Sequence, residues 1–133
     1  MRYLLDTNIC IYLMRRQPAS VAKRFAALRC GDVGMSAITL AELRYGVEAL
    51  PEREHNERAL AALLADIPAV PFGDAAATAY GVIRAAVRDR KRDALDRLIA
   101  AHAISAGLTL VTNNLADFAD YPGLRAENWV DGA

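Results

Sequence analysis

The sequence predicts an α/β fold, with a short parallel sheet covered by helices on both faces. Two features of the chain support this class. Short apolar runs alternate with longer segments of helical periodicity along the whole sequence. The clearest runs, at 3–5 and 108–112, are mostly apolar, as in strands buried on both sides. The chain of 133 residues contains no repeat, low-complexity stretch or linker, so we expect one domain over residues 1–133.

The first elements follow from residues near the N-terminus. Residues 3–5 form an apolar run suited to a buried strand. Asp6 and Thr7 can cap a helix that continues to about residue 16. Pro18 can open a second helix, ending near residue 28.

The middle of the chain repeats this alternation. A turn precedes a short strand at 33–35. A helix with one apolar stripe follows from about 39 to 50, and Pro51 ends it. Another helix spans roughly 54–64. The run at 67–72 resembles a strand, but its prolines confine it to the edge of a sheet.

The C-terminal part contains two helices and the strongest strand signal. Asp74 caps a long helix that reaches about residue 91. The next helix spans 93–106, and Gly107 is a suitable residue to follow its end. Two more strands are expected, at 108–112 and at 127–130. The run at 108–112 gives the strongest strand signal in the chain.

Polar residues follow the two most convincing strands. Asp6, Thr7 and Asn8 come directly after the first strand. Thr112, Asn113 and Asn114, with Asp117 beyond them, follow the strand at 108–112. Ligands of parallel sheets collect beyond the carboxyl ends of strands, where the strand order reverses. If these two strands are neighbours, both polar groups open into one cleft.

Three acidic residues from separate elements are candidates for a metal site. They are Asp6, Glu42 and Asp96. Carboxylate oxygens are the ligands that Mg²⁺ prefers, together with waters and phosphate oxygens of a substrate. Crowded carboxylates raise one another's pKa unless a cation lies among them.

Each acid also has a local explanation. Asp6 fits a helix N-cap. Glu42 fits a capping box that begins at Thr39. Asp96 fits the first turn of a helix capped by Asp93, where a negative charge complements the helix dipole. From the residues alone both interpretations stay open.

Several segments together resemble the PIN-domain ribonuclease toxins of bacterial VapBC toxin–antitoxin pairs. The resemblance extends over essentially the whole chain and rests on the order and spacing of short motifs. These are LLDTN at 4–8, SAIT at 36–39 with AEL at 41–43 and Gly46, Asp96 with LIAAHA at 98–103, VTNN at 111–114 with DF at 117–118, and the tail around 122–129. The resemblance implies a three-layer α/β/α PIN fold.

The resemblance also implies a ligand set for Mg²⁺, with Mn²⁺ as an alternative. Asp6, Glu42 and Asp96 match the first three acids of the family. The fourth position is Asp in many PIN domains and is Asn114 here, with Asp117 as the alternative occupant. Asp93 stands where a small residue is expected. Whether one or two metal ions bind is left open.

Polar neighbours of these acids are expected to hold carboxylates or waters in place. Thr7 and Thr112 are the hydroxyl candidates, though caps at strand ends would explain them equally well. Asn113 and Asp117 are further candidates beside them. His102 follows an apolar pair on a helix, so we expect a hydrogen-bonded core residue and not a general base.

Four basic residues recur at helical spacing on one face of the expected long helix that begins at Asp74, and a fifth lies beyond it. They form either a solvated helix face or a rim that contacts RNA phosphates or an acidic antitoxin segment. The residues are Arg84, Arg88, Lys91, Arg92 and Arg97.

By resemblance, the function is that of a metal-dependent endoribonuclease toxin. Its substrate would be single-stranded or loop RNA, with a tRNA anticodon loop as the leading candidate, and cleavage would block translation. A cognate VapB-type antitoxin would insert a segment into the cleft, and the toxin would form a homodimer. We expect a cytoplasmic location and no membrane span, since no apolar run approaches about 18 residues. The 16 basic and 16 acidic residues balance, so no overall field attracts nucleic acid.

Three other functions are considered. A haloacid-dehalogenase-like phosphatase needs a second Asp two residues after the first, where this chain has Asn8. A response-regulator receiver needs an acidic pair after the first strand and a lysine after the last, and neither is found. A catalytically weak PIN scaffold that binds RNA or protein remains an alternative, because Asn114 would weaken a metal site.

Overall fold

A single parallel sheet organises the molecule. The computed structural model describes residues 1–89 and 94–130. Within these residues five strands pair in the order β3-β2-β1-β4-β5, and every pairing is parallel. The strands are β1 (Tyr3–Leu5), β2 (Val33–Ser36), β3 (Ala69–Val70), β4 (Thr109–Val111) and β5 (Ala126–Glu127). The predicted α/β class is confirmed, and the proline-flanked run at 67–72 does supply an edge strand.

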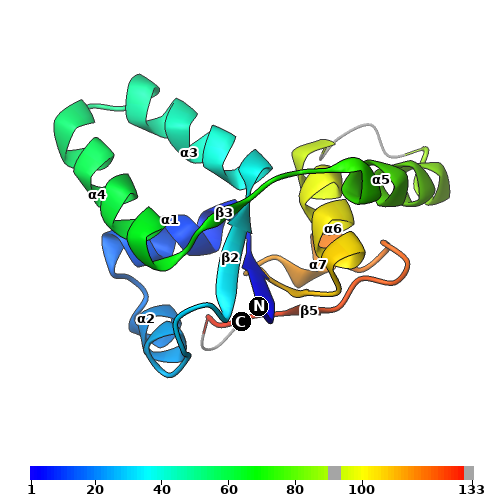
Figure 1. Ribbon diagram of the computed structural model, residues 1–133, viewed down its shortest axis with the longest axis horizontal. Helices are drawn as coiled ribbons and strands as arrows, with labels where there is room; N and C mark the ends of the chain where they lie inside the picture. The colour runs from blue at the N-terminus through cyan, green and yellow to red at the C-terminus, as the bar shows by residue number, and fades with distance from the viewer. Residues whose placement is uncertain (90–93, 131–133) are drawn as a thin grey trace.

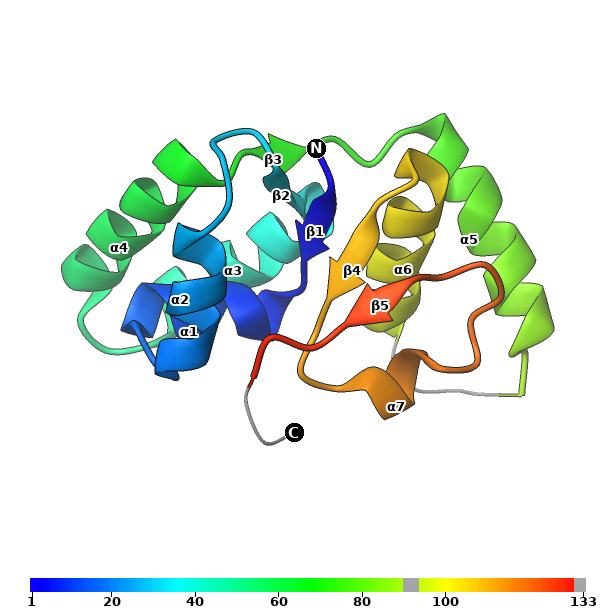
Figure 2. The same cartoon turned by 90° about the horizontal axis from the view of Figure 1, so that it is seen from below.

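Helices lie on both sides of this sheet, as the sequence predicts (Figures 1 and 2). One layer contains α1 (Thr7–Arg15), α2 (Ala19–Ala26), α3 (Ala37–Ala49) and α4 (Arg53–Asp66). The other contains α5 (Asp74–Ala86), α6 (Ala94–Ala106) and α7 (Leu115–Phe118). The helices α5 and α6 pack closely against each other, and α3 also contacts α6. This last contact matters for the site because it joins the two layers.

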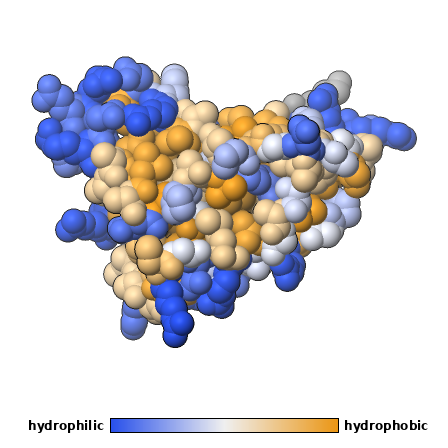
Figure 3. All heavy atoms as spheres, in the orientation of Figure 1, coloured by the Kyte–Doolittle hydropathy of each residue, from blue (hydrophilic) through white to orange (hydrophobic). Residues whose placement is uncertain are grey.

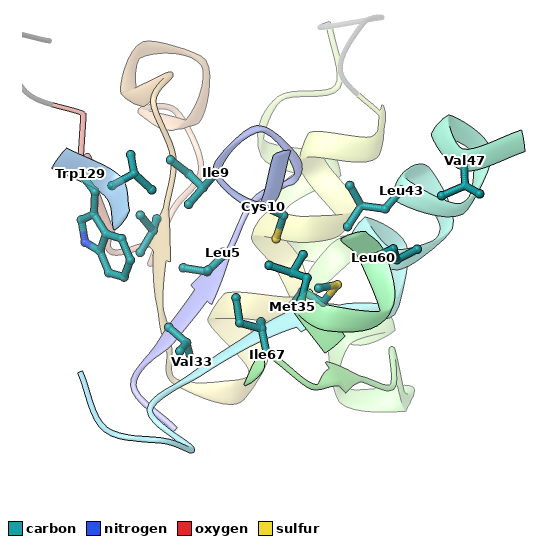
Figure 4. Packing of buried hydrophobic residues seen from close by; sticks show 13 residues of the cluster. Leu5, Ile9, Cys10, Val33, Met35, Leu43, Val47, Leu60, Ile67 and Trp129 are labelled. Atoms are coloured by element: carbon teal, nitrogen blue, oxygen red, sulfur yellow. The ribbon is translucent and has the colours of Figure 1, made fainter. Parts of the chain in front are cut away.

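Each face of the sheet carries its own hydrophobic core, because successive strand side chains point to opposite faces. Leu5 belongs to the cluster under α1–α4, and Leu4 belongs to the cluster under α5–α7. Both leucines are fully buried. Figure 4 shows the first cluster, in which Leu5, Ile9 and Met35 from three elements pack together. Burying a leucine side chain stabilises the fold by about 1.5–3 kcal/mol, so β1 is anchored from both sides.

Several element boundaries differ from the sequence prediction. The last strand, expected at 127–130, is β5 at Ala126–Glu127. Helix α3 begins at Ala37, because the Ser36 hydroxyl caps it by accepting the Ile38 N–H at 3.1 Å. The capping box expected from Thr39 to Glu42 is therefore wrong, and Glu42 lies in the second turn. The cap expected at Asp74 is wrong, because Gly73 is the N-cap of α5 and Asp74 lies in the first turn. Helix α5 ends at Ala86, short of the expected residue 91. Helix α7, which the sequence analysis did not predict, follows Asn114.

No helix among the described residues is both long enough and apolar enough to cross a membrane.

Candidate active site

The two polar strand ends meet, as predicted. Strands β1 and β4 are direct neighbours, with Leu5 opposite Val111. Strands β2 and β3 are added on one side of β1, and the later strands β4 and β5 are added on its other side. The strand order therefore reverses between β1 and β4. The backbone N–H of Asp6 donates to the Val111 carbonyl at 3.0 Å and extends this pairing by one residue. Asp6 and Thr112 thus stand side by side where parallel sheets bind ligands.

The Asp6 carboxylate is almost completely buried at this point, with 6% of the residue exposed. Its Oδ1 accepts the Ile9 N–H at 3.0 Å, so Asp6 is the N-cap of α1, and it also accepts a hydrogen bond from the Thr112 hydroxyl. Burial is the main cause that raises the pKa of Asp6, and the nearby negative charge of Glu42 raises it further. Asp6 is therefore a helix cap and also one of two mutually repelling carboxyl groups.

Glu42 reaches the same edge of the sheet from α3. The Thr7 hydroxyl, one residue beyond Asp6, donates to Glu42 Oε1 at 2.7 Å. Thr39 Oγ1 lies 3.4 Å from the same Thr7 hydroxyl and is fully buried. Thr7, the first residue of α1, thus holds the half-buried Glu42 carboxylate in place, which is the role predicted for this hydroxyl.

Thr112 and Asn114 organise the other strand end. The Thr112 hydroxyl accepts the Asn114 N–H at 3.1 Å, which leaves its own proton for Asp6. The Asn114 side-chain amide donates to the Asp117 carboxylate. The two candidates for the fourth position are therefore hydrogen-bonded to each other, at the start of α7.

Asn113 points elsewhere. Its side-chain amide donates to the Tyr12 hydroxyl of α1 at 2.9 Å, so it links β4 to the opposite helix layer. Sequence reasoning missed Tyr12, because nothing in the sequence indicates which face of α1 turns toward the end of β4.

Asp96 is half-buried in the first turn of α6. The adjacent Asp93 lies outside the described residues. Among residues 1–89 and 94–130, no three His, Cys, Asp or Glu side chains stand close enough together to hold a metal ion. The donor chemistry nevertheless fits a cation such as Mg²⁺. Asp6 and Glu42 carry carboxylate oxygens whose charges repel each other, and a cation between them would offset both that repulsion and the burial of Asp6.

His102 is a hydrogen-bonded core residue, as predicted. It is 3% exposed, and its Nδ1 lies 2.7 Å from Ser36 Oγ. The Phe72 ring packs against the imidazole in a T-shaped arrangement, with centroids 5.5 Å apart. Burial lowers the pKa of His102 below its ordinary value of 6.5, so the ring is neutral at pH 7.

The basic stripe is only partly a surface feature. Arg84 and Arg88 are exposed, and the Arg84 guanidinium lies over the Tyr80 ring at 5.9 Å. Lys91 and Arg92 lie outside the described residues. Arg97 is 5% exposed, so its assignment to the rim is wrong. It lies on α6, the inner helix of its layer, whose residues from Arg97 to Ala103 are buried at nearly every position.

A hollow of about 350 Å³ lies beside the acids, between α1, α3 and α4. Glu42 and Arg15 contribute to its wall, and most of the other side chains are apolar. Figure 3 shows apolar surface in the space that these three helices enclose, with hydrophilic side chains around it. The lining residues include Ile11, Met14, Leu43, Val47 and Leu50.

Comparison with known proteins identifies the same family along nearly the whole chain. The model of the PIN domain matches residues 3–124. The chain is 40% identical over 131 residues to the tRNA(fMet)-specific endonuclease VapC of Shigella flexneri, covering 97% of this chain and 98% of that protein. It is 36% identical to ribonuclease VapC2 of Rickettsia felis, over 97% of this chain and 98% of that protein.

Solved structures agree with the sequence comparison. The VapBC2 structure from Rickettsia felis, bound to a promoter DNA fragment, contains a chain that superposes with a TM-score of 0.90 at 35% identity, covering 98% of this chain and all of that one. A DNA-bound VapBC from Salmonella typhimurium gives a TM-score of 0.90 at 36% identity, over 98% and 99% of the two chains.

Proposed function

This chain belongs to the PIN domain family as a VapC-type ribonuclease toxin of a VapBC toxin–antitoxin system, and from this premise we propose that it is a Mg²⁺-dependent endoribonuclease acting at Asp6. One observation carries the proposal. A nearly buried carboxylate stands where the strand order reverses, and the charge of Glu42 adds to the raised pKa that burial gives it. A carboxyl pair of this kind destabilises the protein unless a cation or a proton occupies the site.

The proposed ligands of Mg²⁺, or of Mn²⁺ in its place, are Asp6, Glu42 and Asp96. Carboxylates from three separate elements suit a cation that keeps several waters and accepts phosphate oxygens. The chemistry that such an ion supplies is Lewis acidity, which lowers the pKa of water and neutralises charge that develops on a phosphoryl group. Asn114 is the neutral fourth group, and its hydrogen bond to Asp117 fixes the direction of its amide.

The chain's own residues orient the reacting groups. Thr7 fixes Glu42 and Thr112 fixes Asp6, so both carboxylates are held before RNA arrives. Water attacks a phosphorus atom of the RNA in line with the bond to the leaving ribose oxygen, and that P–O bond breaks as the new one forms. The attacking water gives up a proton to solvent, and the leaving oxygen takes one up from solvent. His102 takes no part in proton transfer, since its ring is buried against Ser36 and Phe72. Arg84 and Arg88 are exposed cations available to RNA phosphates.

The substrate we propose is a tRNA, cut in a single-stranded loop such as the anticodon loop. The Shigella flexneri relative bears the name tRNA(fMet)-specific endonuclease, and the match covers nearly all of both chains. Cleavage of an initiator tRNA would block translation. The compartment we propose is the cytoplasm, where tRNA is used.

The partner we propose is a VapB-type antitoxin that places a segment in the hollow between α1, α3 and α4. The hollow offers an apolar wall, and Glu42 lies in that wall, so a segment bound there contacts one of the candidate ligands. A homodimer is also proposed. The large apolar side chains exposed on α3 and α5, Tyr45 and Val82 among them, are candidates for its surface.

The test is cleavage of initiator tRNA and of a total tRNA pool by purified protein freed of antitoxin. We expect discrete fragments with Mg²⁺, no fragments with EDTA, and no fragments from Asp6→Asn. Asp66→Asn is the matched control, because Asp66 is an exposed acid at the end of α4 and should retain full activity. Cleavage by folded Asp6→Asn at the rate of the unchanged protein would refute the site.

The alternative of a catalytically weak PIN scaffold has its own signature. Such a scaffold would bind tRNA in a gel-shift assay, with or without Mg²⁺, and would leave it intact. The neutral Asn114 favours this alternative, since an Asp at that position would add a further charge to the site. Metal-dependent fragments exclude it.

A further inference from the structure

His102 and Ser36 form a buried polar contact between the two helix layers. His102 Nδ1 and Ser36 Oγ are 2.7 Å apart, although 66 positions separate them in the chain. Ser36 is fully buried and His102 is 3% exposed. A hydrogen bond this well shielded from water is costly to leave unmade, since either partner alone would be an unsatisfied buried group.

Ser36 has a second bond, which ties this contact to the direction of α3. Its hydroxyl oxygen accepts the Ile38 N–H at 3.1 Å and so caps the helix. Ser36 is also the last residue of β2, paired with Val70. One side chain therefore joins the sheet, the first turn of α3 and, through His102, helix α6.

The two helices joined in this way carry two of the three candidate ligands. Glu42 lies six residues after Ser36 on α3, and Asp96 lies six residues before His102 on α6. At 1.5 Å per residue, each acid is about 9 Å along its helix axis from the contact. A change in the angle between α3 and α6 at this contact would therefore move the two carboxylates relative to each other.

We propose that His102 is a positioning residue for RNA cleavage. Through its bond to Ser36 it fixes the packing of α3 against α6, and so the position of the Glu42 carboxylate relative to that of Asp96. This inference rests on the proposed function. The neutral imidazole and the serine hydroxyl can exchange roles as donor and acceptor, so the bond forms with either tautomer. Phe72 packs against the same ring in a T-shaped arrangement, with centroids 5.5 Å apart, and offers it no hydrogen bond.

The test compares His102→Leu, which removes the polar group, with His102→Asn, whose amide can occupy the place of Nδ1. We expect His102→Leu to lower kcat for tRNA about tenfold with KM unchanged, and to raise the Mg²⁺ concentration that gives half of the maximal thermal shift. His102→Asn should keep both kcat and the Mg²⁺ midpoint within about threefold of their values in the unchanged protein. Phe72→Leu is the packing control and should leave both unchanged.

A double-mutant cycle shows whether the effect passes through Ser36. The combination of Ser36→Ala with His102→Leu should lose no more activity than the worse single variant, because both changes break the same bond. Ser36→Thr keeps a hydroxyl and should retain activity. If His102→Leu does not fold, His102→Ala takes its place in the comparison with His102→Asn, because both keep the Ser36 cap of α3 intact.

Equal kcat and Mg²⁺ midpoints for His102→Leu and the unchanged protein would overturn the proposal. Losses of the same size in the Leu and Asn variants would do so too, because they would show that packing and not the bond is responsible. Failure of the proposed function looks different, since the unchanged protein would then show neither cleavage nor a Mg²⁺ shift that depends on Asp6.

Discussion

The hydrogen bond from Thr7 to Glu42 allows the sharpest test of how the acids are held. Thr7→Val removes the donor and keeps the branched shape, and the two residues have similar helix propensities at the start of α1. Thr7 Oγ1 lies 2.7 Å from Glu42 Oε1, and both residues are half-buried. A hydrogen bond to a charged group contributes about 1.5–3 kcal/mol when fully buried. Partial exposure lets water replace some of it, so we expect a loss of about 1 kcal/mol.

The same 1 kcal/mol sets the expected size of both measured effects. In a chain of this length, Tm should fall by about 4 °C. If the bond is needed to hold Glu42 in the transition state, kcat should fall about fivefold. Thermal unfolding, followed by the fluorescence of the single Trp129, measures the fall in Tm, and cleavage of tRNA at saturating Mg²⁺ measures the fall in kcat.

Thr7→Ser is the matched control, because it keeps the hydroxyl and loses only a methyl group. It should retain activity to within about twofold. A Thr7→Val protein with unchanged kcat would refute the argument that Thr7 orients Glu42, whatever its stability. A Thr7→Ser protein as inactive as Thr7→Val would show that the methyl group, and not the hydrogen bond, is what matters.

Three further predictions concern the metal, a histidine and the C-terminal segment. Mg²⁺ at about 100 times its Kd should stabilise the protein by about 2.7 kcal/mol in thermal unfolding, and a shift of equal size in Asp6→Asn would contradict the assigned ligand. Burial lowers the pKa of His102, so below about pH 6.5 this imidazole is protonated more readily in the unfolded chain than in the native protein. The free energy of unfolding should therefore fall as the pH drops below that value. NMR titration of the imidazole signals checks this, and a His102 midpoint at or above 6.5 would be inconsistent with it. Trp129→Phe removes the indole N–H that donates to Glu127 at 2.8 Å. The free energy of unfolding, measured by circular dichroism, should fall by about 1–2 kcal/mol, while RNA is still cleaved at the full rate. A fall of less than about 0.5 kcal/mol would show the bond to be unimportant.

The fold and the position of the site were predictable because they depend on local patterns. The apolar runs at 3–5 and 108–112 end in polar residues, and the parallel sheet brings such ends to one edge. The start of α3 was misplaced, since Ser36 and Thr39 are both acceptable caps and only the length of β2 decides between them. Arg97 was assigned to the surface because helical spacing identifies a face but not which face turns inward.

Contacts between distant residues were beyond local reasoning. The spacing of the motifs identifies Asp6 and Glu42 as candidates, but not that Thr7 links them. His102 was expected to be a hydrogen-bonded core residue, yet its partner, 66 positions away, depends on how α3 and α6 pack. The same holds for Tyr12, which meets Asn113 across the two layers. Such partners follow from tertiary packing, which one sequence read locally does not contain.

The energetics of Asp6 decide between its two interpretations. As a cap of α1 alone, the residue could be Asn or Ser, which cap about as well as Asp and carry no charge. The chain instead keeps a carboxylate that is 6% exposed and lies near the charge of Glu42. Because these causes raise the pKa of Asp6, the native protein binds a proton more readily than the unfolded chain just above pH 3.8, and its stability falls as the pH rises through that window. The metal-free fold therefore bears a cost for ionising Asp6, and the cap does not require that ionisation. A bound cation would offset this cost, which is why the cap explanation alone is insufficient and the metal-site interpretation is favoured.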